Sequence, residues 1–296
     1  MTQQAKPVVV TGANKGIGRA TVEAILDERD DTRVFLGARA VERGEAARAE
    51  IVDERPNAAS RLEVVQLDVS EERSVKGAAQ EIASRLGSDA LYGIVNNAGI
   101  GDRTHSLEKV LNVNVHGPRR VCEAFVPMIE HPDGRVVNVS SASGPNFVAE
   151  CSPEHRDLLT EPEVTWAQIE EFIEECLAAA GDGEFDDTGI GNGSAYGLSK
   201  ACLNAYTMVV ARENPDLRVN ACTPGFIETD MTRPMAERQG KDPAEVGMKP
   251  PAQGTTAQMF LLFGDPEGTG WYFGSDAKRS PLDRYRSPGD PPYTGD

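Results

Sequence analysis

The sequence predicts an α/β fold in which a parallel, doubly wound sheet of about seven strands carries helices on both faces. Two observations lead to this prediction. Short runs rich in β-branched residues alternate with amphipathic stretches along the chain, which is the pattern of consecutive β-α-β units. A glycine-rich turn directly follows the first of these runs. A chain of 296 residues is long enough for one large domain, so we expect a single domain over residues 1–296.

Six apolar runs predict six of the strands. They read PVVVTG, RVFLGAR, RLEVVQLDV, LYGIVNNAG, GRVVNVSS and LRVNACTPG. In a doubly wound sheet the ligand crevice lies at the carboxyl ends of the strands, so residues that close these runs are candidates for a site. A seventh strand is expected near GWYFG, residues Gly270–Gly274.

Residues 146–193 interrupt the alternation and predict an insertion. Between Asn146 and Gly193 the chain has thirteen acidic residues and a single basic one, Arg156, and it shows no strand pattern. The stretch TWAQIEEFIEECLAAAG predicts a helix whose apolar stripe packs the insertion down; the stripe consists of Trp166, Ile169, Phe172, Ile173, Cys176 and Leu177. Residues 280–296 are rich in Pro, Gly and Asp and are expected to form a flexible tail.

The composition argues against several classes of protein. A net charge of −17 repels a phosphate backbone, so we expect no nucleic-acid partner. Five cysteines without a C-x-x-C pair predict neither a disulfide framework nor a zinc site, and the four histidines match no metal spacing. Nowhere do eighteen apolar residues run together, so we expect no membrane association. The cysteine pattern fits a reducing cytoplasm best, and we assign the protein to that compartment.

The turn after the first strand has the form of a dinucleotide-binding loop. It reads Thr11-Gly12-Ala13-Asn14-Lys15-Gly16-Ile17-Gly18 and is followed by a helix. Glycines let the backbone turn tightly and approach a pyrophosphate, which then lies over the amide groups at the helix N-terminus. The turn therefore predicts a Rossmann domain that binds a nucleotide cofactor.

The T-G-x-x-x-G-x-G spacing resembles that of the short-chain dehydrogenase/reductase family, and later stretches resemble it too. Asn96-Asn97-Ala98-Gly99 closes the fourth strand, and Pro224-Gly225 follows the sixth. The resemblance covers roughly residues 7–275. It implies that the cofactor is held by Gly12, Asn14, Lys15, Gly16, Ile17, Gly18, Arg39, Asp68, Val69, Asn96, Ala98, Gly99, Tyr196, Lys200, Pro224, Gly225, Ile227 and Thr229.

The end of the second strand indicates which nucleotide is bound. Members of the family that use NAD usually have an acidic residue there, whereas this strand ends in Arg39. Together with Lys15 in the glycine turn, Arg39 would provide two cations for a 2′-phosphate, which favours NADPH/NADP as the cofactor. The alternative is that Arg39 is only a solvated charge at a strand end.

Tyr196 and Lys200 form the Tyr-x-x-x-Lys pair of the family, at the start of an apolar helix. Residues i and i+4 lie on one face of a helix, so the ammonium can stabilise the phenolate. A free tyrosine has a pKa of about 10 and is a poor acid at neutral pH without such help. The pair predicts that Tyr196 exchanges a proton with a substrate oxygen and that Lys200 also holds the nicotinamide ribose.

Two further catalytic residues are implied by the resemblance. Asn114, in NVNVHGP, matches the asparagine that orders a proton-relay water, and Asn112 is the alternative. Ser141, which stands three places before Gly144, matches the serine that hydrogen-bonds the substrate oxygen. The neighbouring Ser140 and Ser143 are expected to be structural or to contact the substrate.

The interval from Ser141 to Tyr196 is 55 residues, much longer than in most members of the family. Such an insertion resembles that of the carbonyl-reductase branch, where it walls one side of the active site and occupies the usual dimer interface, so a monomer is implied. Phe226 and Met231 would line the substrate pocket or pack a lid. Relatives often have tryptophan where this chain has Phe226, which leaves the selectivity of the pocket open.

Taken together, these residues predict an NADPH-dependent oxidoreductase that reduces a small ketone, aldehyde or quinone to the alcohol. Two alternatives remain at this level. One is NADP-dependent oxidation of a secondary alcohol by the same groups. The other is a regulator that binds NADP(H) without catalysis, although such proteins typically lose the tyrosine or the lysine.

Overall fold

The protein folds around one twisted sheet. The computed structural model describes residues 5–101, 104–181, 183 and 185–295. Eight strands form the sheet in the order β3-β2-β1-β4-β5-β6-β7-β8. Their bounds are β1 Lys6–Val10, β2 Thr32–Ala38, β3 Leu62–Gln66, β4 Gly93–Asn96, β5 Arg135–Val139, β6 Arg218–Cys222, β7 Tyr272–Phe273 and β8 Arg279–Ser280. The doubly wound fold and the seventh strand are confirmed, and β8 adds an antiparallel edge that the sequence did not predict.

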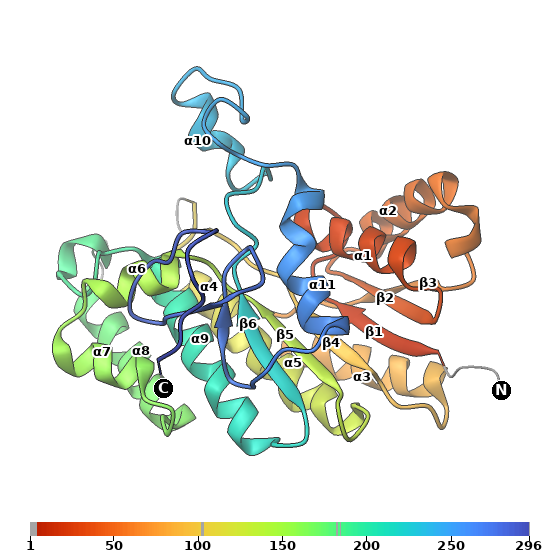
Figure 1. The fold of residues 1–296 in the computed structure, drawn as a ribbon, viewed down its shortest axis with the longest axis horizontal. Coiled ribbons are helices and arrows are strands. Elements are labelled where there is room, and N and C mark those ends of the chain that lie inside the picture. The colour runs from red at the N-terminus through yellow and green to blue at the C-terminus, as the bar shows by residue number, and fades with distance from the viewer. Residues whose placement is uncertain (1–4, 102–103, 182, 184, 296) are drawn as a thin grey trace.

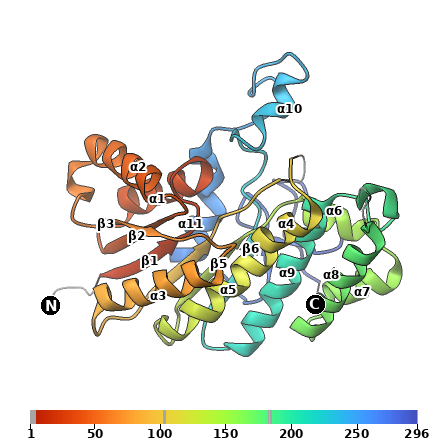
Figure 2. The ribbon, with the colours of Figure 1, turned by 180° about the vertical axis from the view of Figure 1, so that it is seen from behind.

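Helices cover both faces of the sheet. They are α1 Gly16–Glu28, α2 Val41–Glu54, α3 Glu72–Leu86, α4 Leu107–Leu111, α5 Gly117–Phe125, α6 Ser143–Ala149, α7 Pro153–Thr160, α8 Trp166–Ala180, α9 Ala195–Glu213, α10 Arg233–Glu237 and α11 Thr256–Phe263. Views from opposite sides show α1, α2 and α11 over one face and α3, α5 and α9 over the other (Figures 1 and 2). No helix in the described ranges is both long enough and apolar enough to span a bilayer.

The core consists of two apolar layers, one on each face of the sheet. Along β1, Val9 faces the layer under α3, α5 and α9, whereas Val8 and Val10 face the layer under α1, α2 and α11. All three are fully buried. This is the alternation of a strand covered on both faces, and it explains why the sequence shows continuous apolar runs there.

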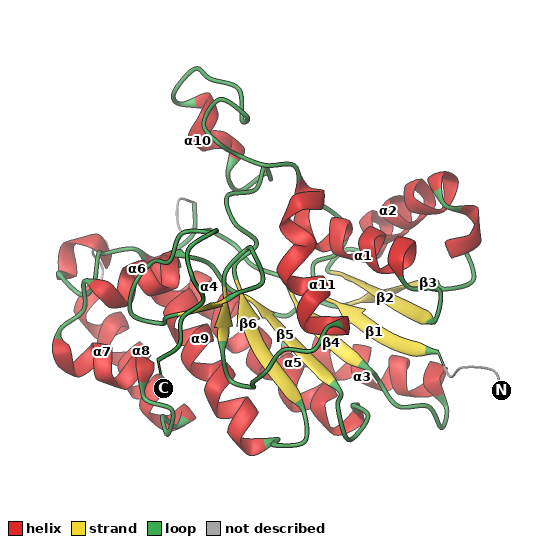
Figure 3. Cartoon of the chain, in the orientation of Figure 1, coloured by secondary structure: helices red, strands yellow, loops and turns green. Residues whose placement is uncertain are grey.

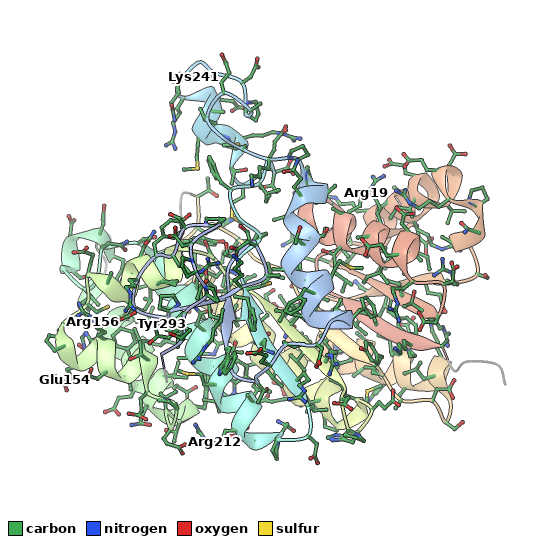
Figure 4. All side chains as sticks on the ribbon, viewed as in Figure 1. Arg19, Glu154, Arg156, Arg212, Lys241 and Tyr293 are labelled. Carbon is green, nitrogen blue, oxygen red and sulfur yellow. The ribbon has the colours of Figure 1, made fainter. Side chains whose placement is uncertain are left out.

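The insertion folds as α7, α8 and a short 3-10 turn, Phe185–Thr188, and packs against α9 (Figure 3). The predicted helix is confirmed: it begins at a capping box between Thr165 and Gln168, and its apolar stripe joins the core. Arg212 on α9 donates to the Val164 carbonyl at 2.7 Å, and Arg156 donates to the Ala149 carbonyl at 2.8 Å (Figure 4). The two arginines therefore tie the insertion to α9 and to the end of α6.

The C-terminal tail differs from the expected flexible segment. Ser280 lies in β8, and Tyr293 donates its backbone N–H to the Arg279 carbonyl at 2.9 Å. The Arg279 guanidinium lies 3.8 Å from the ring centre of Trp271 and 5.3 Å from that of Tyr293. These cation–π contacts are tertiary contacts that belong to no sequence motif, so the composition of the tail alone gave no sign of them.

The chain between β6 and α11 forms an arm that projects beyond the carboxyl ends of the strands. Figure 1 shows α10 in this arm, standing apart from the helical layers, and Figure 4 labels Lys241 near its tip. The base of the arm, residues 224–231, runs beside the crevice that the doubly wound topology predicts.

Candidate active site at the carboxyl edge of the sheet

The turn between β1 and α1 is built for close approach. Gly12 and Gly16 have φ values of +62° and +58°, which favour glycine. A Cβ at Gly12 would lie 2.9 Å from the Cα of Ala98, and one at Gly18 would collide with the Asn97 amide. The glycines therefore let the turn lie directly on the end of β4, leaving a cradle in which a pyrophosphate can meet the backbone.

The two adjacent asparagines after β4 have different partners. Asn97 Nδ2 donates to the Thr11 carbonyl at 2.9 Å, and the Thr11 hydroxyl oxygen accepts from the backbone N–H groups of Asn97 and Ala98, both at 3.0 Å. Asn96 is buried and donates from Nδ2 to Asn138 Oδ1 at 2.9 Å. The side chain of Asn96, which the resemblance assigned to the cofactor, is therefore engaged within the sheet. Thr11 and Asn97 were missing from the predicted site, although both lie within its motifs.

Asn114 lies in a π-helical turn, Asn112–His116, between α4 and α5. Its Nδ2 donates to the Ile100 carbonyl at 2.9 Å and to Ser199 Oγ at 3.0 Å, and its Oδ1 accepts from the Ile100 N–H at 2.9 Å. Such turns are rare and often mark functional positions. Asn112 instead accepts from Arg120 at 2.7 Å, so Asn114 is the asparagine that contacts α9.

Tyr196 and Lys200 lie in the first turns of α9, whose N-terminus is capped by Ser194. The Lys200 ammonium lies 5.5 Å from the centre of the Tyr196 ring, so the expected juxtaposition is present. It donates to the Val139 carbonyl at the end of β5, at 2.8 Å. A Cβ at Gly99 would lie 3.7 Å from this ammonium and 3.3 Å from Asn114 Oδ1, so Gly99 keeps the space beside both groups open.

Burial determines the protonation of Lys200. Only 3% of this residue is exposed, and loss of solvation lowers the pKa of its ammonium to about 8. The nearby Cys222 thiol does not offset this effect, because burial raises the pKa of that thiol to about 12 and keeps it neutral. Among the described residues no carboxylate pairs with Lys200. A buried ammonium without a carboxylate partner is costly to the fold, which points to a role in chemistry.

The serines after β5 divide into one buried and two more accessible groups. Ser140 is buried, and its hydroxyl donates to the Lys200 carbonyl at 3.2 Å, a structural contact. Ser141 donates to Ser143 Oγ at 3.2 Å and accepts from the Ser143 N–H at 3.1 Å. Ser141 and Ser143 are both partly buried, so their hydroxyls are the ones available at the edge of the sheet.

Two glycines bring this serine segment against α9. A Cβ at Gly144 would lie 3.0 Å from the carbonyl carbon of Lys200, and one at Gly197 would lie 3.1 Å from the carbonyl oxygen of Ser143. Larger residues would push the strand end away from the helix. The structure therefore brings the segment of Ser141 to the turn of α9 that carries Tyr196 and Lys200.

The residues predicted to bind the adenosine end are only partly brought together. Arg39 is exposed at the end of β2, and within the described ranges its guanidinium has no ion-pair partner. Lys15 instead pairs with Asp230 at 2.7 Å, so it faces the base of the arm. Asp68 Oδ1 accepts from the N–H and hydroxyl of Ser70 at 3.0 and 2.7 Å, and Val69 is buried against Gly117.

The base of the arm closes the site from the other side. Gly225, with φ +90°, follows Pro224 and lies against Ser275. Thr229 approaches the glycine turn: its Cγ2 lies 3.5 Å from where a Cβ of Gly16 would be. Ile227 is buried, and a Cβ at Gly254 would lie 2.9 Å from its Cγ1.

Phe226 and Met231 present apolar surface here. They are 39% and 38% exposed, and Met231 packs beside Gly101. Both therefore offer side chains that a small molecule in the crevice could cover. In the ranges that the structure describes, no group of three or more His, Cys, Asp or Glu side chains is arranged to hold a metal ion.

Comparison with known families agrees with this architecture. The sequence model of the short chain dehydrogenases matches residues 6–153 and 187–240. The chain belongs to the short-chain dehydrogenase/reductase family. The residues between the two matched ranges, 154–186, fall within the insertion that distinguishes the carbonyl-reductase-like branch.

Three relatives place this short-chain dehydrogenase within the family. It is 34% identical over 253 residues to (+)-neomenthol dehydrogenase of Arabidopsis thaliana, covering 75% of this chain and 83% of that protein. It is 32% identical over 296 residues to Carbonyl reductase [NADPH] 1 of Sus scrofa, covering 94% of each. Among solved structures it resembles menthone neomenthol reductase from Mentha piperita, with a TM-score of 0.74, 25% identity, and coverage of 92% of this chain and 99% of that one.

Lys200→Met tests the cost of the buried ammonium. Between about pH 8 and the ordinary lysine pKa of 10.5, the unfolded chain binds more protons at this position than the folded one, so wild-type stability gains from rising pH. Below pH 8 the full cost is present. We expect the variant to exceed the wild type in free energy of unfolding by on the order of 2 kcal/mol at pH 7, and this excess to shrink as the pH approaches 10.5.

Urea unfolding of the wild type and of Lys200→Met from pH 7 to 10 measures the difference in their free energies of unfolding. Other titrating groups contribute equally to both proteins, so their contributions cancel in this difference. Lys278→Met, at an exposed position, is the control and should show no such dependence. A difference between Lys200→Met and wild type that stays constant over this pH range would contradict the assignment.

Proposed function

We propose that this protein reduces the carbonyl group of a ketone, aldehyde or quinone to the alcohol, using NADPH. The observation that carries the proposal is the Lys200 ammonium, which is buried beside the Tyr196 ring with no carboxylate partner among the described residues. Burial of such a charge lowers the stability of the fold. Catalysis in this family explains why the charge is kept there, because the ammonium favours loss of a proton from the Tyr196 phenol.

The proposed roles follow from the position of each group. Tyr196 donates its proton to the substrate oxygen as negative charge develops there, and the Ser141 hydroxyl hydrogen-bonds the same oxygen. Lys200 holds its positive charge one helical turn away and stabilises the phenolate that remains. Asn114 fixes Ile100 and Ser199 through its side chain, so it holds the loop after β4 against α9.

The residues at the crevice fit a dinucleotide. The cradle formed by Gly12, Gly16 and Gly18 has no side chain that would block a pyrophosphate, and Gly99 leaves the space beside Lys200 open. When bound there, NADPH supplies the hydride that the carbonyl carbon accepts. The name of the Sus scrofa relative, Carbonyl reductase [NADPH] 1, supports this cofactor. The Arg39 guanidinium, which has no ion-pair partner in the described part of the chain, offers a partner for its 2′-phosphate.

The same groups would catalyse oxidation of a secondary alcohol in reverse, so the direction follows the cellular ratio of NADPH to NADP. A regulator that only binds NADP(H) could use the Lys200 ammonium to hold the ribose, but it would have no use for the Tyr196 phenol beside that ammonium. The neomenthol dehydrogenase and menthone neomenthol reductase among the relatives support a carbonyl or alcohol as the substrate.

Tyr196→Phe tests the proton donor. Loss of the hydroxyl should lower turnover of a carbonyl substrate by at least about 100-fold, the usual contribution of a general acid. NADPH binding should stay within about threefold of wild type, because the ring and Lys200 remain. Absorbance of NADPH measures turnover and fluorescence titration measures binding. Tyr206→Phe, deeper in α9, is the matched control and should keep its activity; near-normal turnover by Tyr196→Phe would refute the role.

Arg39→Asp tests the choice of cofactor. Removing the cation and adding a carboxylate should weaken NADPH binding by about 10- to 100-fold through loss of a charged phosphate contact, and should change NADH binding much less. Arg73→Asp, an exposed change of the same charge on α3, controls for the general field of the protein. Equal losses for both cofactors in a binding titration would mean that Arg39 serves only the fold.

We further propose that the protein is a monomer of the cytoplasm. The insertion covers α5 and α9: Arg119 of α5 lies 4.2 Å from the ring centre of Trp166, and Arg212 of α9 bonds to the Val164 carbonyl. All five cysteines are buried free thiols, which suits a reducing compartment. Sedimentation equilibrium should give the mass of one chain, whereas the mass of a dimer would contradict the monomer. Cell fractionation tests the compartment.

A further inference from the structure

Large apolar side chains are seldom exposed in the part of the chain that the structure describes. Among the described residues only Val41, Phe226, Met231 and Tyr285 are exposed large apolar side chains. Phe226 and Met231 lie at the base of the arm, beside the crevice. Tyr285 lies in the tail after β8 and is the most exposed of the four, at 53%. An aromatic ring in water on an otherwise polar tail requires an explanation.

The tail holds the backbone of Tyr285 in place. The neighbouring Arg286 is 6% exposed by its side chain and pairs with Asp276. It also donates to Ser280 Oγ at 2.9 Å and to the Asp290 carbonyl at 2.8 Å. A buried arginine with these partners fixes the chain on one side of Tyr285, whose ring remains half exposed. Tyr285 is thus presented by an ordered segment.

Contacts connect this segment to the crevice. Asp276 belongs to the turn between β7 and β8, at the carboxyl edge of the sheet. Ser275 of the same turn lies against Gly225, directly before Phe226: a Cβ at Gly225 would be 3.2 Å from Ser275 Cβ.

Electrostatics agree with this placement. Burial raises the pKa of Tyr272 in β7, and negative charge on Tyr196 or on Tyr285 would raise it further. Both phenols therefore lie within electrostatic reach of the same buried side chain.

We propose that Tyr285 is a specificity-determining residue, whose ring packs against the apolar body of the carbonyl substrate while Phe226 and Met231 contact it from the arm. The proposal rests on the proposed function. The substrate would then have a flat or cyclic apolar group that extends from its carbonyl to the protein's C-terminal tail, where Tyr285 lies. A half-exposed tyrosine suits this task because its face covers apolar surface while its hydroxyl stays in water.

The test compares Tyr285→Ala and Tyr285→Phe with the wild type on two ketones, 2-acetonaphthone and 2-butanone. Loss of the ring should lower kcat/KM for the naphthyl ketone by about tenfold, as expected for losing roughly half the contact area of an aromatic side chain. The value for 2-butanone, which is too small to reach the tail, should stay within about twofold. Tyr285→Phe should resemble the wild type on both. Tyr293→Ala, another tail tyrosine, is the control and should leave the ratio of the two ketones unchanged.

Equal losses on both ketones, no loss on either, or a Phe variant as impaired as the Ala variant would overturn the proposal. Calorimetric titration of 2-acetonaphthone in the presence of NADP measures the contact without turnover. If the wild type turns over neither ketone, the proposed function is in question, and the role of Tyr285 is then decided by binding alone. Equal affinity of wild type and Tyr285→Ala would overturn it, and weaker binding by the variant would support it.

Discussion

The site depends on one costly placement, a lysine ammonium inside the protein. Lys200 lies on a buried helix and donates to a main-chain carbonyl at the end of β5. Removal of a charge from water without an opposite charge nearby is unfavourable, and the lowered pKa of Lys200 expresses that cost. The large apolar layers on both faces of the sheet offset it. Part of the stability of the fold thus offsets the cost of holding a cation beside the Tyr196 phenol, whose pKa the cation can lower.

Glycines determine where that cation lies. Gly144 and Gly197 let the end of β5 touch α9, and Gly99 leaves open the space beside Lys200. On the nucleotide side, Gly12 and Gly18 play the same part between β1 and β4. Each glycine costs backbone entropy on folding, and in return two strands and a helix approach closely enough to share one small volume. The geometry of the crevice is therefore set by close backbone packing.

The fold was predictable because both of its signals are local. Strands covered on both faces read as continuous apolar runs, and α8 shows its stripe and its cap within one stretch of sequence. The pair Tyr196 and Lys200 was predictable for the same reason, since helix geometry fixes residues i and i+4. Predictions failed where a partner lies far away in sequence. Asn96 turns to Asn138 on the next strand, and the composition of the tail gave no sign of its contacts with β7 and β8.

The insertion does more for the site than cover a surface. Trp166 of α8 packs edge-on against His116, with ring centres 5.6 Å apart, and against Tyr206 of α9 at 5.5 Å. His116 ends the π-helical turn that contains Asn114, and burial lowers the pKa of its imidazole, so it packs as a neutral ring. One indole therefore joins the turn that carries Asn114 to the helix that carries Tyr196. The π-helical turn and α9 are also joined directly by the hydrogen bond from Asn114 to Ser199. The turn and the helix are therefore held together at two places, by Trp166 of the insertion and by Asn114 in the site.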